Sequence, residues 1–146
     1  MVRGIGKTQR RTRIDMLEAT TIAVSVAREW RDLYEAFWRP EAFVSWASGL
    51  ADASLTQAGE EWRTRGPGGP VVIVFTGRNA LGVMDHWVRP QDGPTIYVPL
   101  RIIGNDDGAL VSLTLFRQPG MSDAKFAEDA DWVRRDLQRL KAIAEA

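Results

Sequence analysis

Apolar positions near the start of the chain switch from strand-like to helical spacing. The segment MLEATTIAVSV, residues 16–26, is rich in β-branched side chains and predicts a strand. The next segment, AREWRDLYEAF, places Trp30 and Phe37 at helical spacing. Pro40 suits the first turn of a second short helix, which Gly49 would end. The chain is therefore expected to open with one strand and two helices.

The middle of the chain predicts about six strands that are joined by short turns. ASLTQAGEEWRTRG holds a turn near Ala58 and Gly59 between two short strands, and GPGGP is a loop by composition. The runs VVIVFTG, LGVMDHWV, IYVPLRII and ALVSLTLF follow, and Asp-Gly pairs in RPQDGPT and NDDG are hairpin signals. Sequential hairpins build an antiparallel sheet.

The last segment, MSDAKFAEDADWVRRDLQRLKAIAEA, predicts one long helix that Ser122 or Asp123 can cap. Its apolar stripe consists of Phe126, Ala130, Val133, Leu137, Leu140 and Ala144. The helix should span about 24 residues, with one apolar face. A helix of this kind packs across the sheet, so residues 16–146 are expected to form a single α+β domain in the order β-α-α-β6-α.

Composition narrows the chemistry. The chain has 146 residues, of which 45% are hydrophobic and 26% charged, as in an ordinary globular domain. It has no Cys and one His, which argues against disulfides, thiolate zinc sites and multi-histidine metal sites. No apolar run approaches the roughly 20 residues that a membrane span needs. We therefore expect a cytoplasmic protein with no membrane span, no metal and no organic cofactor.

The formal net charge of zero hides a basic N-terminal segment. Residues 1–15 carry five basic residues and one acidic residue, which leaves 14 basic and 18 acidic residues in the remainder. An acidic body argues against a nucleic-acid partner. The segment is predicted to be a disordered tail or the product of an upstream start, since Met16 precedes the first strand; a nucleic-acid or membrane-surface arm is the alternative.

Several segments resemble the START-like helix-grip superfamily (SRPBCC). AREWRDLYEAFWRPEAFVSW is similar to the opening helices of that superfamily, in which a Trp, here Trp46, closes the second helix. GEEWR, GVMDH, PLRIIGNDDGALVSLTLFRQPGMSD and DLQRLK resemble a bacterial branch labelled polyketide cyclase/dehydrase-like. The resemblance covers about Leu17 to Glu145. It implies a curved antiparallel sheet of about seven strands around the long helix, and a cavity between them for apolar or aromatic small molecules.

The hairpin at RPQDGPT determines which side of its strand Asp85 and His86 occupy. A two-residue turn at Asp92-Gly93 pairs Trp87 with Val98 and Asp85 with Leu100. The row Ile96, Val98, Leu100 and Ile102 is apolar and should face the helix. On this register Val83, Asp85 and Trp87 face the cavity and His86 faces outward. Pro94 cannot donate to a strand ladder, and a three-residue loop would reverse the assignment.

Asp85 and His86 are the candidates for chemistry. Adjacent strand residues point to opposite faces, so they cannot easily form a proton-transfer pair. An inward Asp85 could act as an acid or base, anchor a ligand hydroxyl, or be satisfied structurally by Asn79, an Arg or backbone donors. His86 is the weaker candidate, with an ordinary outward histidine as its alternative.

The expected function is binding of an apolar or aromatic small molecule. A cyclase or dehydratase that uses Asp85 and a non-catalytic protein-interaction module are the alternatives, and a homodimer is left open. The predicted ligand-binding residues are Trp46, Trp62, Phe75, Asn79, Val83, Trp87, Val98, Leu100, Leu113, Phe126, Ala130 and Val133.

Overall fold

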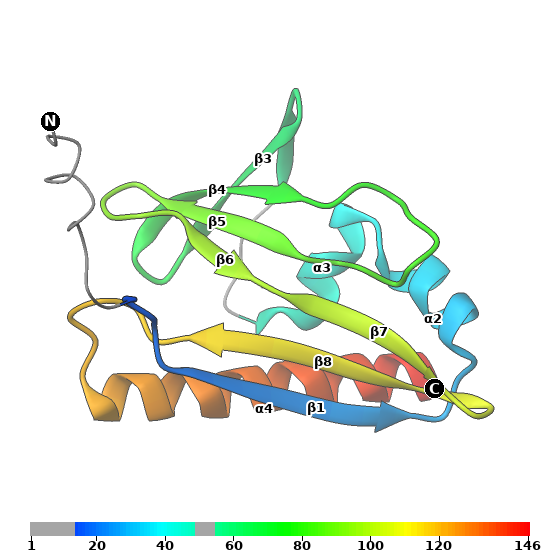
Figure 1. The fold of residues 1–146 in the computed structure, drawn as a ribbon. Helices are drawn as coiled ribbons and strands as arrows, with labels where there is room; N and C mark the ends of the chain where they lie inside the picture. The colour runs from blue at the N-terminus through cyan, green and yellow to red at the C-terminus, as the bar shows by residue number, and fades with distance from the viewer. Residues whose placement is uncertain (1–13, 49–54) are drawn as a thin grey trace, which may run out of the picture.

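The computed structural model describes residues 14–48 and 55–146. Its elements follow the predicted order of strand, two helices, several strands and a long helix (Figure 1). They are β1 (Ala19–Val26), α2 (Trp30–Phe37), α3 (Pro40–Trp46), β2 (Thr56–Ala58), β3 (Glu61–Gly66), β4 (Gly69–Phe75), β5 (His86–Pro90), β6 (Ile96–Val98), β7 (Leu100–Asn105), β8 (Gly108–Phe116) and α4 (Asp123–Glu145). The predicted α+β class is confirmed. The predicted helix end at Gly49 and most of the basic segment lie outside the described residues.

The strands form two antiparallel sheets, in the orders β1-β8-β7 and β2-β3-β4-β5-β6. The described residues hold eight strands where about seven were expected, because IYVPLRII divides at Pro99. Proline has no backbone N–H and interrupts a ladder. Before Pro99, β6 pairs with β5, and after it β7 pairs with β8. The division between the two sheets therefore falls at this proline.

The segment between β4 and β5 departs from the prediction. LGVMDHWV was expected to be one strand, but β5 begins only at His86. Residues 82–84 instead lie along β7, where Met84 N donates to Leu100 O at 2.8 Å and Ile102 N donates to Gly82 O at 2.9 Å. This short stretch links the two sheets.

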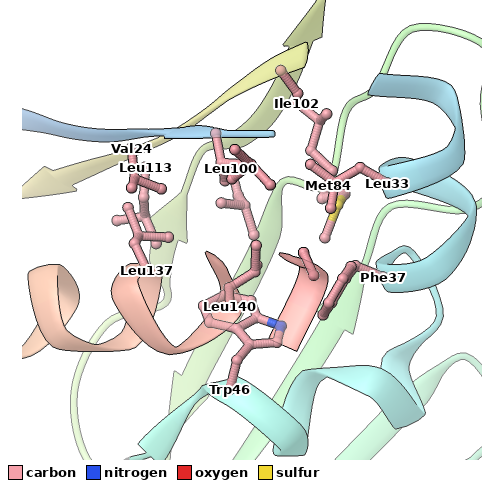
Figure 2. Close-up of a cluster of buried hydrophobic side chains, with 14 of the residues drawn as sticks. Val24, Leu33, Phe37, Trp46, Met84, Leu100, Ile102, Leu113, Leu137 and Leu140 are labelled. Carbon is pink, nitrogen blue, oxygen red and sulfur yellow. The ribbon is translucent and has the colours of Figure 1, made fainter. Parts of the chain in front are cut away.

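The helix α4 lies along β1 and β8 (Figure 1), and its apolar stripe packs against the sheet as predicted. Leu137 and Leu140 are almost completely buried, and Ser122 caps the helix by accepting from Lys125 N at 3.0 Å. Figure 2 shows Leu137 beside Val24 and Leu113, and Leu140 close to Trp46. Burial of this apolar surface is the main force that holds the helix to the sheet.

The predicted register of the β5–β6 hairpin was wrong. His86 pairs with Val98, Trp87 with Tyr97 and Val88 with Ile96. The pairing is shifted by one residue from the predicted one, because the connection from Pro90 to Ile96 is longer than a two-residue turn. A one-residue shift moves every side chain to the other face. His86 therefore points inward and is 3% exposed, whereas Trp87 points outward and is 38% exposed.

Candidate functional site

A cleft of about 310 Å³ lies between α4 and the inner face of the sheet, next to α3. We call it the sheet–helix cleft. Nine apolar or aromatic residues line it: Phe43, Ala47, Pro67, Val71, Ile73, Val88, Leu115, Trp132 and Val133. Gly66, Asp129 and Asp136 complete the lining. The sheet–helix cleft is thus an apolar site with two carboxyl groups on its helical wall.

Strand alternation positions the sheet side of this cleft. Trp62, Ile73, Val88 and Ile96 occupy paired positions on β3, β4, β5 and β6, so they share the inner face. Val71 lies two residues before Ile73 and faces the same way. The strands therefore present β-branched side chains to the helix at regular intervals.

The polar part of the cleft is a small network around Asp136. Its Oδ1 accepts from Ser48 N at 3.1 Å and from Ser48 Oγ at 2.5 Å. Ser48 Oγ in turn accepts from Trp132 Nε1 at 2.7 Å. Burial raises the pKa of Asp136, and the hydrogen bonds from Ser48 offset only part of that effect. A half-buried carboxyl of this kind can hold a ligand hydroxyl or exchange a proton.

His86 lies in an aromatic cluster next to the cleft. Its ring centroid is 5.1 Å from that of Phe43, which also lines the cleft, and 5.7 Å from that of Phe75. The ring atom Nδ1 lies 3.2 Å from Met84 O. Burial lowers the pKa of His86 to about 4. The hydrogen bond with Met84 O and the charge of Asp85 raise this pKa, but less than burial lowers it. The imidazole is therefore neutral at physiological pH.

Asp85 lies on the other face of the sheet, away from the cleft. Arg101 Nε donates to Oδ1 and Arg101 Nη2 donates to Oδ2, both at 2.8 Å. Tyr97 Oη donates to Oδ2 at 2.6 Å, and Leu100 N donates to Oδ1 at 3.0 Å. Burial alone would raise the pKa of Asp85, but these hydrogen bonds outweigh it and lower the pKa to about 2. Asp85 is therefore an ionised partner of Arg101 at neutral pH.

The inward orientation predicted for Asp85 and Trp87 is therefore corrected. Trp87 stacks on Tyr97 with ring centroids 5.3 Å apart, and Tyr97 stacks on Phe116 at 6.2 Å. Val83 forms an isolated bridge with Arg101, so it does not face the cleft either. These side chains build the outer face of the sheet, and a reaction in the cleft has no access to the Asp85 carboxylate.

The other predicted ligand-binding residues do not lie together. Val133 alone among them lines the sheet–helix cleft. Trp62 and Phe75 line a separate groove of about 550 Å³ that also contains charged residues such as Arg39 and Glu41. Core positions or positions packed against the core are occupied by Trp46, Val98, Leu100, Leu113 and Ala130. Asn79 holds its own loop by accepting from Val83 N at 3.1 Å, and Phe126 lies 5.9 Å from the Arg117 guanidinium.

Sequence reasoning missed most of the cleft, including its polar wall. Asp129, Trp132 and Asp136 follow one another at three- and four-residue spacing along the border of the α4 apolar stripe. This spacing puts them on one flank of the helix. A Trp with an acidic residue four positions later, beside an apolar stripe, was the signal that could have identified this wall.

The described part of the chain shows neither a metal site nor a membrane span. No group of three or more His, Asp or Glu side chains within it could hold a metal ion. None of its helices is long and apolar enough to cross a bilayer.

Solved structures with low sequence identity share this fold. A START superfamily protein from Mycobacterium smegmatis superposes with a TM-score of 0.65 at 12% identity, over 87% of this chain and 97% of that one. The Aha1 dimer from Colwellia psychrerythraea gives a TM-score of 0.68 at 12% identity, over 88% and 97% of the two chains. DynU16, a protein of the dynemicin biosynthetic locus, gives 0.65 at 19% identity, over 88% of this chain and 47% of its own.

Sequence comparison adds no narrower assignment. No protein-family model matches the chain, and no curated protein matches it. The resemblance to a polyketide cyclase/dehydrase-like branch therefore stays a prediction. The element order, the sheet curved around α4 and the structural neighbours together show that the protein has a START-like helix-grip fold.

Proposed function

We propose that the protein binds an apolar or aromatic small molecule in the sheet–helix cleft. The observation that carries this proposal is an open volume of about 310 Å³ lined by apolar side chains such as Val71, Leu115 and Val133. Small-molecule sites are typically concave, largely apolar and about 300–1,000 Å³ in volume. The larger groove beside Trp62 is less suitable, because Arg39, Glu41 and Glu60 contribute to its lining.

A fluorescent probe tests the site directly. N-phenyl-1-naphthylamine is neutral and apolar, and its emission rises when it leaves water. We expect saturable binding to the wild-type protein. Val133→Trp should weaken binding by about tenfold or more, because the larger ring occupies the cleft. Ala127→Trp places the same ring on an exposed position of α4 and should leave the affinity unchanged. Equal affinities for the wild type and Val133→Trp would exclude the cleft as the site.

Native mass spectrometry provides an independent test. A protein that binds an apolar ligand tightly should retain it through purification, so the wild type should show the mass of the chain plus that of the ligand. Val133→Trp should show the mass of the chain alone. Loss of this mass from Ala127→Trp as well would indicate that the molecule binds elsewhere.

A cyclase or dehydratase is the second candidate, with Asp136 in place of Asp85 as the acid or base. The observation that favours it is the raised pKa of a carboxyl group in the cleft wall. Catalytic carboxyl groups are commonly adjusted in this direction by burial. If a retained ligand is converted on incubation with fresh protein, Asp136→Asn should stop the conversion and keep the binding. Equal conversion by wild type and Asp136→Asn would exclude this assignment.

A further inference from the structure

Among the described residues, the Ser48 and Trp132 donors beside Asp136 are all used within the protein. The Ser48 hydroxyl and the Ser48 backbone N–H both donate to Oδ1 of Asp136. The indole N–H of Trp132 donates to Ser48 Oγ. An indole has no other polar hydrogen, and a serine hydroxyl has only one. A ligand that approaches this wall therefore meets acceptors.

One of these acceptors is the second oxygen of the Asp136 carboxyl group. Among the described residues, Oδ2 of Asp136 has no hydrogen-bond partner, whereas Oδ1 has two. An ionised carboxylate has capacity for about four hydrogen bonds. Because Asp136 lines the cleft, a donor on a bound molecule can form a hydrogen bond with Oδ2.

The charges of the lining residues also favour a ligand that donates hydrogen bonds. Asp129 is a second carboxylate in the wall, and no Arg, Lys or His is among the described residues that line the cleft. Lys125 pairs with Asp129 at 2.5 Å, but its side chain is half exposed and lies outside the lining. Arg135 and Arg139 lower the pKa of Asp136, but less than burial raises it, and neither residue lines the cleft. The described lining therefore offers a negatively charged ligand no cation.

We propose that the sheet–helix cleft selects an apolar molecule that carries an ammonium or hydroxyl group, and rejects the corresponding carboxylate. This specificity rests on the proposed function. An ammonium donor forms a charge-assisted hydrogen bond with Asp136 and supplies the counter-charge that the wall lacks. A hydroxyl donates to the same oxygen. A carboxylate would instead be placed beside the Asp136 carboxylate, with no cation among the described lining residues, and the two like charges would repel.

Four molecules with the same aromatic body test the inference at neutral pH. They are 2-naphthylmethylamine, 2-naphthalenemethanol, 2-naphthoate and the unsubstituted reference 2-methylnaphthalene, each competing with N-phenyl-1-naphthylamine. We expect the amine and the alcohol to bind at least about tenfold more tightly than the carboxylate. Asp136→Asn keeps the size of the side chain and should reduce this preference to roughly threefold or less.

A matched variant controls for the change in net charge. Asp131→Asn removes one carboxylate from the same helix, but Asp131 is exposed and pairs with Arg134 at 2.8 Å. It should keep the wild-type preference. Loss of the preference in Asp131→Asn to the same extent as in Asp136→Asn would overturn the assignment to Asp136.

The outcomes separate the inference from the proposed function. Suppose that 2-naphthoate binds as tightly as the alcohol, and that 2-methylnaphthalene binds the wild type but binds Val133→Trp weakly. The inference then fails and the proposed function stands. If none of the four molecules competes, or Val133→Trp changes none of the affinities, the proposed function fails and the inference fails with it.

Discussion

At the scale of single residues, Asp85 and His86 occupy opposite electrostatic environments although they are adjacent in the chain. The Asp85 carboxylate faces outward and is held by Arg101, Tyr97 and the N–H of Leu100. The His86 imidazole faces inward among Phe43 and Phe75. Hydrogen bonds stabilise the charged form of Asp85, and burial destabilises the charged form of His86. The two groups therefore respond to pH differently.

His86 should make stability fall as the solution becomes mildly acidic. Its folded pKa of about 4 lies below the ordinary value of 6.5, so the unfolded chain binds the proton first. The contribution of neutral His86 is complete above pH 6.5 and is lost as the pH falls toward 4, by about 3 kcal/mol in total. Urea unfolding across this range should show the slope in the wild type and a smaller one in His86→Phe. Identical slopes would contradict a buried His86.

The single histidine also gives an unambiguous NMR signal. Its ring resonances should not titrate between pH 8 and about 5.5 if the pKa is lowered by burial. A titration midpoint near the ordinary pKa of histidine would indicate an exposed ring. It would then support the register that the two-residue turn predicts.

Asp85→Asn should destabilise the fold and leave the cleft intact. Loss of the charge leaves Arg101 without its partner, and the free energy of unfolding should fall by about 2 kcal/mol at pH 7. The folded pKa of about 2 lies below the ordinary 3.8, so this contribution is complete above pH 3.8 and disappears as the pH falls toward 2. Chemical denaturation measures the difference, with Asp92→Asn in the exposed turn as the control. Loss of probe binding in Asp85→Asn without loss of folding would contradict its outward position.

At the scale of elements, the loop that precedes β5 depends on a very close backbone approach at Gly82. Gly82 has a φ of +73°, and a Cβ at this position would lie 2.2 Å from Ile102 O. The same residue accepts the N–H of Ile102, which attaches the loop to β7. Any larger residue must displace backbone, and the loop positions Met84 and His86 in the core.

Gly82→Ala should therefore lower the free energy of unfolding by about 2 kcal/mol or more, through strain at positive φ and the clash with Ile102. Gly77→Ala is the matched control in the same connection, because nothing lies within 4 Å of its Cβ and its φ is not positive. Thermal and urea unfolding should show a large loss for the first variant and little change for the second. Equal effects would contradict the close approach.

The helices and most strands were predictable because each depends on a local pattern. The α4 stripe and the Ser122 cap are local signals, and both are present in the structure. The register of β5 on β6 depends on the length of a loop with Pro90 and Pro94 at its ends, which a sequence pattern does not fix. That one-residue difference reversed the predicted orientations of Asp85, His86 and Trp87. The cleft itself combines α3, α4 and four strands, so no single segment reveals it.

At the scale of the whole molecule, the cleft lies where α3 and α4 meet strands of both sheets. The β1-β8-β7 sheet carries the core under α4, while the β2-β3-β4-β5-β6 sheet continues beyond it (Figure 1). Val71, Val88 and Val133 approach from the second sheet and the helix without filling the space between them. The fold therefore separates a packed core from an apolar cleft with one acidic wall.

The most direct test is the position of a bound ligand in solution. Isotope-filtered NOEs should be measured between unlabelled 2-methylnaphthalene and the protein methyl groups. The account predicts contacts with the methyl groups of Val71, Val88, Leu115 and Val133, which line the cleft, and none with Val74, which lines the neighbouring groove. Contacts confined to Val74 and its surroundings would contradict the central claim, because the ligand would then lie outside the sheet–helix cleft.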